Sequence, residues 1–173
     1  VFSASLSKPA EDLTSTSPGT GFMTMIYDDA AHTLQVDISF SDLLGTTTAS
    51  HIHAPTADPF VGTAGVATQV PTFSGFPLGV TSGSYDHTFD LTDAGSFNPT
   101  FVTNNGGTAA GAEAALISAM LNGKAYLNIH STYRPGGEIR GFLAVPDGST
   151  TMILLGGGLA ALAALKRRRR ILG

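Results

Sequence analysis

The sequence predicts a mainly β protein, an antiparallel Greek-key sandwich or barrel with one inserted short α-helix and a C-terminal hydrophobic helix. Three observations predict this class. Short stretches alternate apolar and polar residues, the pattern of strands that bury one face. The 173 residues include 21 Gly and 9 Pro, which supply many turns. Helical spacing interrupts the strand pattern of the body in one segment, and a long apolar run near the C-terminus precedes a basic cluster.

Six stretches show the alternation expected of strands. In 32–40, for example, Leu34, Val36 and Ile38 face one side, while the intervening polar residues face the other. The turn residues Asp28 and Asp29 precede this stretch, so we expect it to form a hairpin with the stretch before it. The predicted strands are 21–27, 32–40, 49–53, 83–91, 124–130 and 138–145.

The predicted helix covers Ala109–Leu121. Thr108 is its expected N-cap, because a hydroxyl oxygen can accept from a free backbone N–H, and Gly123 is its expected stop. Two long loops rich in Gly and Pro, 54–82 and 92–107, complete the body, and loops of that length are usually functional or disordered. The apolar stripe of the helix is expected to consist of Leu116, Ile117, Met120 and Leu121.

The charge of the chain divides into two parts. Residues 1–146 carry four basic and twelve acidic side chains, a formal charge of −8, whereas 147–173 carry five basic and one acidic, +4. Nucleic-acid binders cluster basic residues in the folded part, so the acidic body excludes this class of partner. The chain has no cysteine, which excludes disulfides, thiolate metal sites and cysteine nucleophiles.

The C-terminal segment has the pattern of a membrane anchor. Residues 151–165 carry no charge, and as a helix they reach about 22 Å, so snorkelling and local thinning are needed to cross a core of about 30 Å. By the positive-inside bias the basic end stays in the cytoplasm and 1–146 face outward. Val1 begins strand-like sequence, so the chain is either cytoplasmic or numbered after a cleaved leader, and the tail favours the leader. The basic end consists of Lys166, Arg167, Arg168, Arg169 and Arg170.

The residues before this segment make the tail more specific. Val145, Pro146 and Asp147, followed by the apolar run and the basic end, resemble the C-terminal sorting signals of the PEP-CTERM class, in the variant that opens Val-Pro-Asp. The resemblance implies an exosortase-type enzyme as a partner that cuts near the motif. It also implies an exported protein that is anchored in the membrane only transiently. The expected division is a domain over 1–144 and a sorting signal over 145–173.

Three histidines form the strongest candidate site of the body. His51 and His53 are spaced i, i+2 on a predicted strand, so both imidazoles project from one face, and His130 has the same outward position beside Ile129. If the two strands are neighbours, three imidazoles converge, a ligand set that suits zinc or copper with an open fourth position. The alternative is a structural network in which these rings bond to loop carbonyls.

Further polar residues accompany this cluster in the sequence. Asn128 shares the outward face of His130, and Glu138 shares a strand face with Arg140. Glu138 and Arg140 are expected either to orient a ligating histidine or to form a structural ion pair, and Asp58 or Glu138 is a candidate carboxylate ligand. The other two histidines are expected outside this cluster. His32, in the turn after Asp29, is expected at the surface. His87, between Tyr85 and Phe89, is expected in a partly buried position beside their rings.

Three motifs of the body stand in a characteristic order: ASHIHAP at 49–55, YLNIHS at 126–131 and PGGEIRG at 135–141. In this order they resemble the CHRD domain, which is repeated in chordin and occurs singly in many bacterial exported proteins. The resemblance spans about residues 2–144 and departs at 8–13, where KPAEDL replaces the usual Glu-Val-Pro-Pro stretch. It implies a β-sandwich, immunoglobulin-like or superoxide-dismutase-like, and leaves the activity unassigned.

Three functions follow as hypotheses. The first is an exported module of the cell surface or extracellular matrix with a non-enzymatic binding or structural role, because no Gly-x-Ser-x-Gly motif, phosphate loop or paired-carboxylate site is present. The second is a mononuclear copper or zinc protein, with or without redox activity, that uses His51, His53 and His130. The third is a self-assembling surface or matrix subunit. The expected partners are the sorting enzyme, the membrane before processing, and an exopolysaccharide or further copies of the chain.

Overall fold

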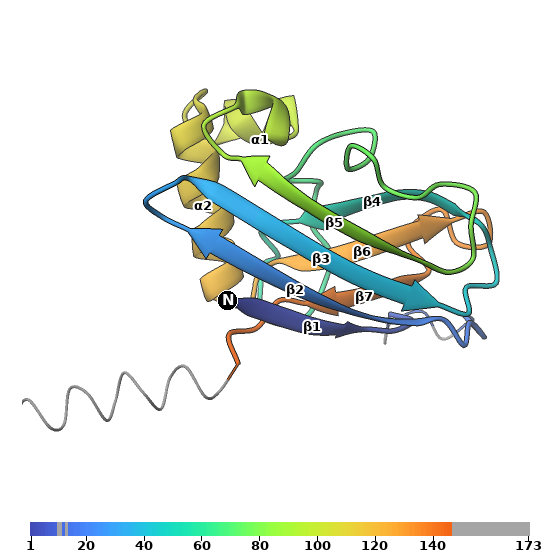
Figure 1. Ribbon diagram of the computed structural model, residues 1–173. Coiled ribbons are helices and arrows are strands. Elements are labelled where there is room, and N and C mark those ends of the chain that lie inside the picture. The colour runs from blue at the N-terminus through green and yellow to red at the C-terminus, as the bar shows by residue number, and fades with distance from the viewer. Residues whose placement is uncertain (10–11, 13, 147–173) are drawn as a thin grey trace, which may run out of the picture.

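Seven strands and three helical segments make up the computed structural model, which describes residues 1–9, 12 and 14–146 (Figure 1). The alternating stretches form strands close to the predicted positions, because one face of each strand is buried in the core. The strands are β1 (Phe2–Leu6), β2 (Thr20–Asp28), β3 (Thr33–Ser41), β4 (Thr47–His53), β5 (Gly83–Asp90), β6 (Tyr126–Ser131) and β7 (Ile139–Phe142). The helices are η1 (Ala94–Ser96), α1 (Pro99–Asn104) and α2 (Ala109–Leu121).

The strands form two antiparallel sheets that face each other. One sheet has the order β1-β2-β3-β5 and the other the order β4-β6-β7, so the chain changes sheet after β3, β4 and β5. β2 and β3 pair in the expected hairpin. Two isolated bridges join the sheets along one side: Ser3 of β1 pairs with Ala144, just after β7, and Ser7, just after β1, pairs with Arg140 of β7. The predicted mainly β sandwich is therefore confirmed, with one side closed as in a barrel.

The core lies between the two sheets. The four-stranded sheet contributes Met23 and Val36, and the three-stranded sheet contributes Ile52, Leu127 and Ile129, all fully buried. Burying an aliphatic side chain of this size contributes roughly 1.5–3 kcal/mol. The inward position of Ile52 and Ile129 has a direct consequence: their sequence neighbours point to the outer face of the three-stranded sheet.

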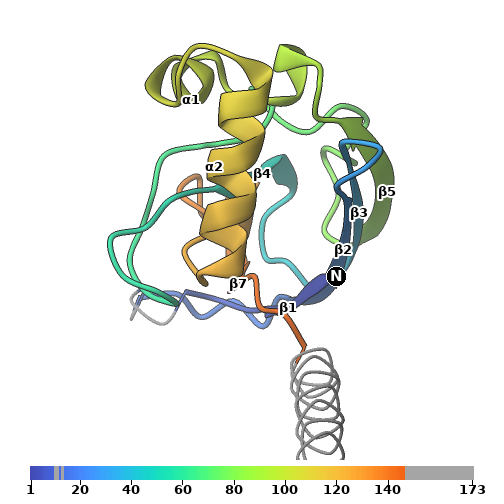
Figure 2. The same cartoon turned by 90° about the vertical axis from the view of Figure 1, so that its left-hand side faces the viewer.

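Helix α2 lies across one end of the sandwich and covers the gap between the sheets (Figure 2). Its ends agree with the prediction: the Thr108 side chain accepts from the Gly111 N–H, and Gly123 follows the helix with φ +66°. The predicted stripe is wrong in part, because Leu121 in the last turn is 62% exposed. Small residues take part in the packing instead, and the buried positions are Ala112, Glu113, Leu116, Ala119 and Met120.

The two long loops differ from each other. Residues 54–82 contain no strand or helix, as expected, although Val66 and Thr68 make isolated bridges. The loop predicted over 92–107 instead contains η1 and α1. The Asn98 side chain accepts from the Thr100 N–H, and Pro99 occupies the first helical position, so a capping residue and a proline start α1.

The predicted tail lies beyond the part of the chain that the structure describes. Of the predicted sorting signal, only Val145 and Pro146 are described. Asp147, the predicted hydrophobic helix and the basic end at 166–170 lie outside the described residues. Within the described ranges, none of the helices combines the length and apolar character needed to cross a membrane.

Candidate metal centre

β4 and β6 bring the three predicted histidines together on the outer face of the three-stranded sheet. The strands pair antiparallel, with Ala49 opposite His130, His51 opposite Asn128 and His53 opposite Tyr126. This register is required by the core, because a shift of one residue would turn Ile52 outward and both histidines of β4 inward. His51 and His53 are buried, and His130 is partly exposed.

One ring nitrogen of each histidine belongs to a compact group. The three atoms lie within 4.8 Å of one another, and the ring centroids are 5.1 to 5.8 Å apart. The closest approach is 3.2 Å, between Nδ1 of His51 and Nε2 of His130. Neither Asp58 nor Glu138 belongs to this group, so among the described residues the ligand set consists of imidazoles alone.

The second ring nitrogen of each histidine faces a backbone carbonyl. His51 Nε2 lies 2.6 Å from the Pro71 oxygen, His53 Nδ1 lies 2.9 Å from that of Ala64, and His130 Nδ1 lies 2.7 Å from that of Pro135. A carbonyl can only accept, so each of these nitrogens carries the proton and donates it. The lone pairs of the three neutral rings therefore point toward the centre of the group, from His51 Nδ1, His53 Nε2 and His130 Nε2.

This arrangement leaves the imidazoles incompletely bonded. With both protons committed to carbonyls, Nδ1 of His51 and Nε2 of His130 face each other as two acceptors. Nε2 of His53 is buried and has no hydrogen-bond partner within the described part of the chain. Burial lowers the pKa of all three rings, that of His53 to about 4, so protons do not fill the gap at neutral pH.

Tyr126 and Arg140 extend the histidine group through two aromatic contacts. The Tyr126 ring stacks on His53 with a centroid distance of 4.9 Å and an interplanar angle of 4°. The Arg140 guanidinium, from the strand on the opposite side of β6, lies 4.9 Å from the Tyr126 centroid. The Tyr126 hydroxyl also accepts from the N–H of Ala64, the residue whose carbonyl bonds His53. Sequence reasoning missed Tyr126, although its position two residues before Asn128 placed it on the same face.

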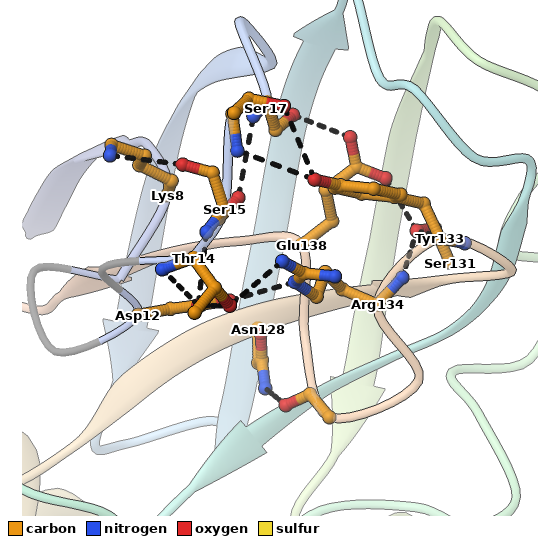
Figure 3. Close-up of polar contacts among 12 residues, drawn as sticks. Lys8, Asp12, Thr14, Ser15, Ser17, Asn128, Ser131, Tyr133, Arg134 and Glu138 are labelled. Atoms are coloured by element: carbon orange, nitrogen blue, oxygen red, sulfur yellow. Dashed lines mark hydrogen bonds and ion pairs between the residues drawn. The ribbon is translucent and has the colours of Figure 1, made fainter.

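Glu138 occupies a separate polar cluster at the end of the sandwich. Its buried carboxylate accepts from Ser17 Oγ at 2.5 Å and from the hydroxyl of Ser131 (Figure 3). It also accepts from Leu44 N at 2.6 Å and Gly45 N at 3.1 Å. Burial raises the pKa of this carboxyl, but the four hydrogen bonds outweigh it, and the net pKa is lowered. The expected orienting role toward His51 or His53 belongs instead to the carbonyls of Ala64 and Pro71.

The Glu138 cluster supports His130 indirectly, through the turn between β6 and β7. Ser131 binds Glu138, and Arg134 in the same turn donates to Asp12 at 2.8 Å (Figure 3). The Pro135 carbonyl, which bonds His130, lies inside this turn. Gly137 has φ +123° and packs so closely that a Cβ there would overlap Asn128, whose amide donates to Gly136. Asn128 thus packs against the turn, and its buried Oδ1 has no hydrogen-bond partner among the described residues.

The two other histidines stay outside the group, as predicted. The His32 side chain is 51% exposed and forms an ion pair with Glu113 of α2 at 3.0 Å. His87 lies between Tyr85 and Phe89, with ring centroid distances of 6.0 and 4.6 Å. Both are matched controls for the cluster, because their imidazoles belong to the same fold but to other contacts.

Comparison with known proteins gives two matches. Residues 2–143 match the family model of the CHRD domain, and residues 144–169 match that of the VPDSG-CTERM motif. The chain reads Val145-Pro146-Asp147-Gly148-Ser149 at the motif, with Gly and Ser in exchanged order. No curated protein and no solved structure shows a significant match.

The second match identifies the tail as a sorting signal of PEP-CTERM type, which implies processing by an exosortase-type enzyme. Together the two matches indicate an exported protein associated with the cell envelope. Since the first match covers most of the sequence, the chain belongs to the CHRD family.

Proposed function

We propose that this exported protein binds one transition-metal ion through His51, His53 and His130 and carries it at the cell surface. The observation behind the proposal is the orientation of the rings: each donates one nitrogen to a carbonyl and directs the other toward a common centre. Metal-ligating histidines commonly donate their second nitrogen in this way, because the hydrogen bond fixes the tautomer and the orientation of the ring.

The ligand chemistry restricts the metal. Neutral imidazoles suit copper and zinc, whereas calcium and magnesium require oxygen ligands. His130 is partly exposed, so an ion can enter from its side. Three protein ligands leave a further position for water or a small ligand. The proposed role is binding, without a catalytic step.

A purely structural network explains the same contacts less well. Such a network needs a proton between His51 and His130, and a donor for His53 Nε2. The carbonyls take both available protons, and the lowered pKa values disfavour additional ones at neutral pH. A cation between the rings completes all three at once. Leaving buried polar groups unpaired otherwise costs about 1–3 kcal/mol each.

Metal titration of the full-length protein tests this proposal. After treatment with a chelator, the protein should bind one equivalent of zinc or copper, measured by elemental analysis after desalting. His53→Gln and His130→Gln should each abolish most binding, and the double variant should abolish all of it. His87→Gln, the matched control, should bind as the parent does. Stoichiometric binding by a folded double variant, or no binding by the parent, would overturn the proposal.

A further inference from the structure

We infer that the centre selects monovalent copper, Cu(I), over the divalent ions Zn(II) and Cu(II). This inference rests on the proposed function and names the ion that the site favours. Three features carry it: the neutrality of all three ligands, the burial of His51 and His53, and the position of the carboxylates of the described chain outside the group. Each favours an ion of low charge and low coordination number.

The first argument concerns charge. A metal bound to three neutral imidazoles keeps its full charge, and the energy of burying an ion grows with the square of that charge. A divalent ion therefore meets about four times the desolvation penalty of a monovalent ion of similar size. The buried carboxylate of Glu138, just before β7, is committed to four donors and does not compensate this charge.

The positive neighbour of the site points the same way. The Arg140 guanidinium stacks over Tyr126, and Tyr126 stacks over His53, so a cationic side chain lies two rings from the ligands. Its repulsion on a divalent ion is twice that on a monovalent ion. The outer face of the three-stranded sheet thus combines lone pairs for a metal with an environment that disfavours high charge.

The second argument concerns coordination number. Zinc with three histidine ligands takes a water as its fourth ligand, and Cu(II) prefers tetragonal geometry, so both need solvent or other donors beyond three imidazoles. Cu(I) has a filled d shell and is stable with three ligands. Beside the rings, the Tyr126 hydroxyl accepts from Ala64 and the Asn128 amide nitrogen donates to Gly136. Asn128 Oδ1 is buried without a hydrogen-bond partner in the described chain, but it packs against Gly137. A further donor for a divalent ion would therefore come from solvent.

Competition titrations on the full-length protein test the selectivity. Cu(I) affinity is measured without oxygen against bicinchoninate, and Zn(II) and Cu(II) affinities are measured against chromophoric chelators. Relative to the aqueous couple, we expect Cu(I) to be favoured over Cu(II) by at least 100-fold. For a one-electron couple this raises the copper reduction potential by about 120 mV. Zn(II) should bind more weakly than Cu(I) by at least the same factor.

A pair of variants isolates the charge argument. Ala49 lies opposite His130 in the register and is partly exposed, so Ala49→Asp adds a carboxylate beside the ligands. This variant should improve Zn(II) binding relative to Cu(I) by about tenfold. Ala49→Asn has nearly the same shape without the charge and should leave the ratio unchanged. Arg140→Gln, which removes the positive charge, should move the ratio in the same direction as Ala49→Asp.

The outcomes separate the inference from the proposed function. Binding of Zn(II) or Cu(II) as tight as that of Cu(I) overturns the selectivity, while the metal site itself stands. An equal ratio of Zn(II) affinity to Cu(I) affinity in Ala49→Asp and Ala49→Asn overturns the charge argument for the selectivity. Failure of all three ions to bind overturns the proposed function. Loss of Cu(I) binding in the His53→Gln, His130→Gln variant, with retention in His87→Gln, assigns the ion to this centre.

Discussion

Two polar clusters lie on neighbouring strands of the same sheet, and they differ in how completely they are bonded. The Glu138 carboxylate has four donors for its two oxygens. The three imidazoles direct three lone pairs at one another and have no donor between them, and His53 Nε2 is left without a partner. A satisfied cluster stabilises the fold, whereas an unsatisfied buried cluster is retained at a cost, which supports the proposed metal site.

The largest effect on stability should come from the satisfied cluster. Glu138→Gln replaces an acceptor by a donor and leaves part of the set Ser17, Ser131, Leu44 and Gly45 unpaired. We expect it to lower the free energy of unfolding by about 3 kcal/mol, measured by urea unfolding of the metal-free protein. Glu113→Gln, at a buried carboxylate with fewer partners, is the control and should lose clearly less. A loss below about 1 kcal/mol would contradict the role assigned to Glu138.

The two clusters should respond differently to a fall in pH. Unfolded histidine takes up a proton below pH 6.5, whereas His53 resists protonation down to about pH 4, so the unfolded state binds more protons between these values. Stability of the metal-free protein should therefore be complete above pH 6.5 and fall with pH, by roughly 3 kcal/mol for His53 alone at pH 4. The Glu138 pKa is lowered, so its contribution persists until pH falls below the value of about 4.5 for an ordinary carboxyl.

Unfolding measured from pH 7.5 to 5 in the presence of a chelator checks this pH dependence. The His53→Gln, His130→Gln variant should show a flatter profile than the parent. His87→Gln should keep the parental slope. A parent profile that is flat between pH 6.5 and 5 would mean that the three rings do not resist protonation.

A smaller effect, on metal affinity, should show that the Glu138 cluster supports the histidine group. Glu138 holds Ser131, and the turn that follows presents the Pro135 carbonyl to His130. Glu138→Gln should therefore weaken metal binding by about tenfold, the lower end of what is typical for groups that orient ligands. The stoichiometry should stay at one ion. Ser17→Ala removes a donor from the N-terminal side only and should leave the affinity unchanged, so equal losses in both variants would point to general destabilisation.

The smallest effect should come from His32, the histidine that pairs with a carboxylate. The Glu113 hydrogen bond, with the charge of Glu113, raises the pKa of His32. Its stabilising contribution is complete below pH 6.5 and is lost as pH rises through the raised value. His32→Gln should therefore destabilise the protein more at pH 6 than at pH 9, as seen in thermal unfolding. The reverse order would show that the pair does not form.

The strand pattern was sufficient to predict that the three histidines share one face, but not what surrounds them. Alternation around Ile52 and Ile129 predicted which faces carry His51, His53 and His130, because burial of one face fixes the other. The carbonyls of Ala64 and Pro71 come from the irregular loop 54–82, and their positions depend on contacts that no periodicity encodes. The Glu138 cluster was missed for the same reason, since Ser17 is 121 residues away.

Helix α2 shows what its sequence could predict and what it could not. Thr108 and Gly123 marked its ends correctly, because capping depends on residues next to the helix. Its buried face was predicted less well, since the sheets decide which side is covered, and they favoured Ala112 and Ala119 over Leu121. Helix α1 was missed, although Asn98 and Pro99 mark a helix start.

The seam between β1 and the final strand bears on how the protein can be delivered. The Ala144 N–H donates to the Ser3 carbonyl, Val145 still packs against the core, and Pro146 is exposed. A transpeptidase that cuts beyond Pro146 would therefore break no described hydrogen bond of the domain. Such a cut would also leave the three histidines on β4 and β6 in place.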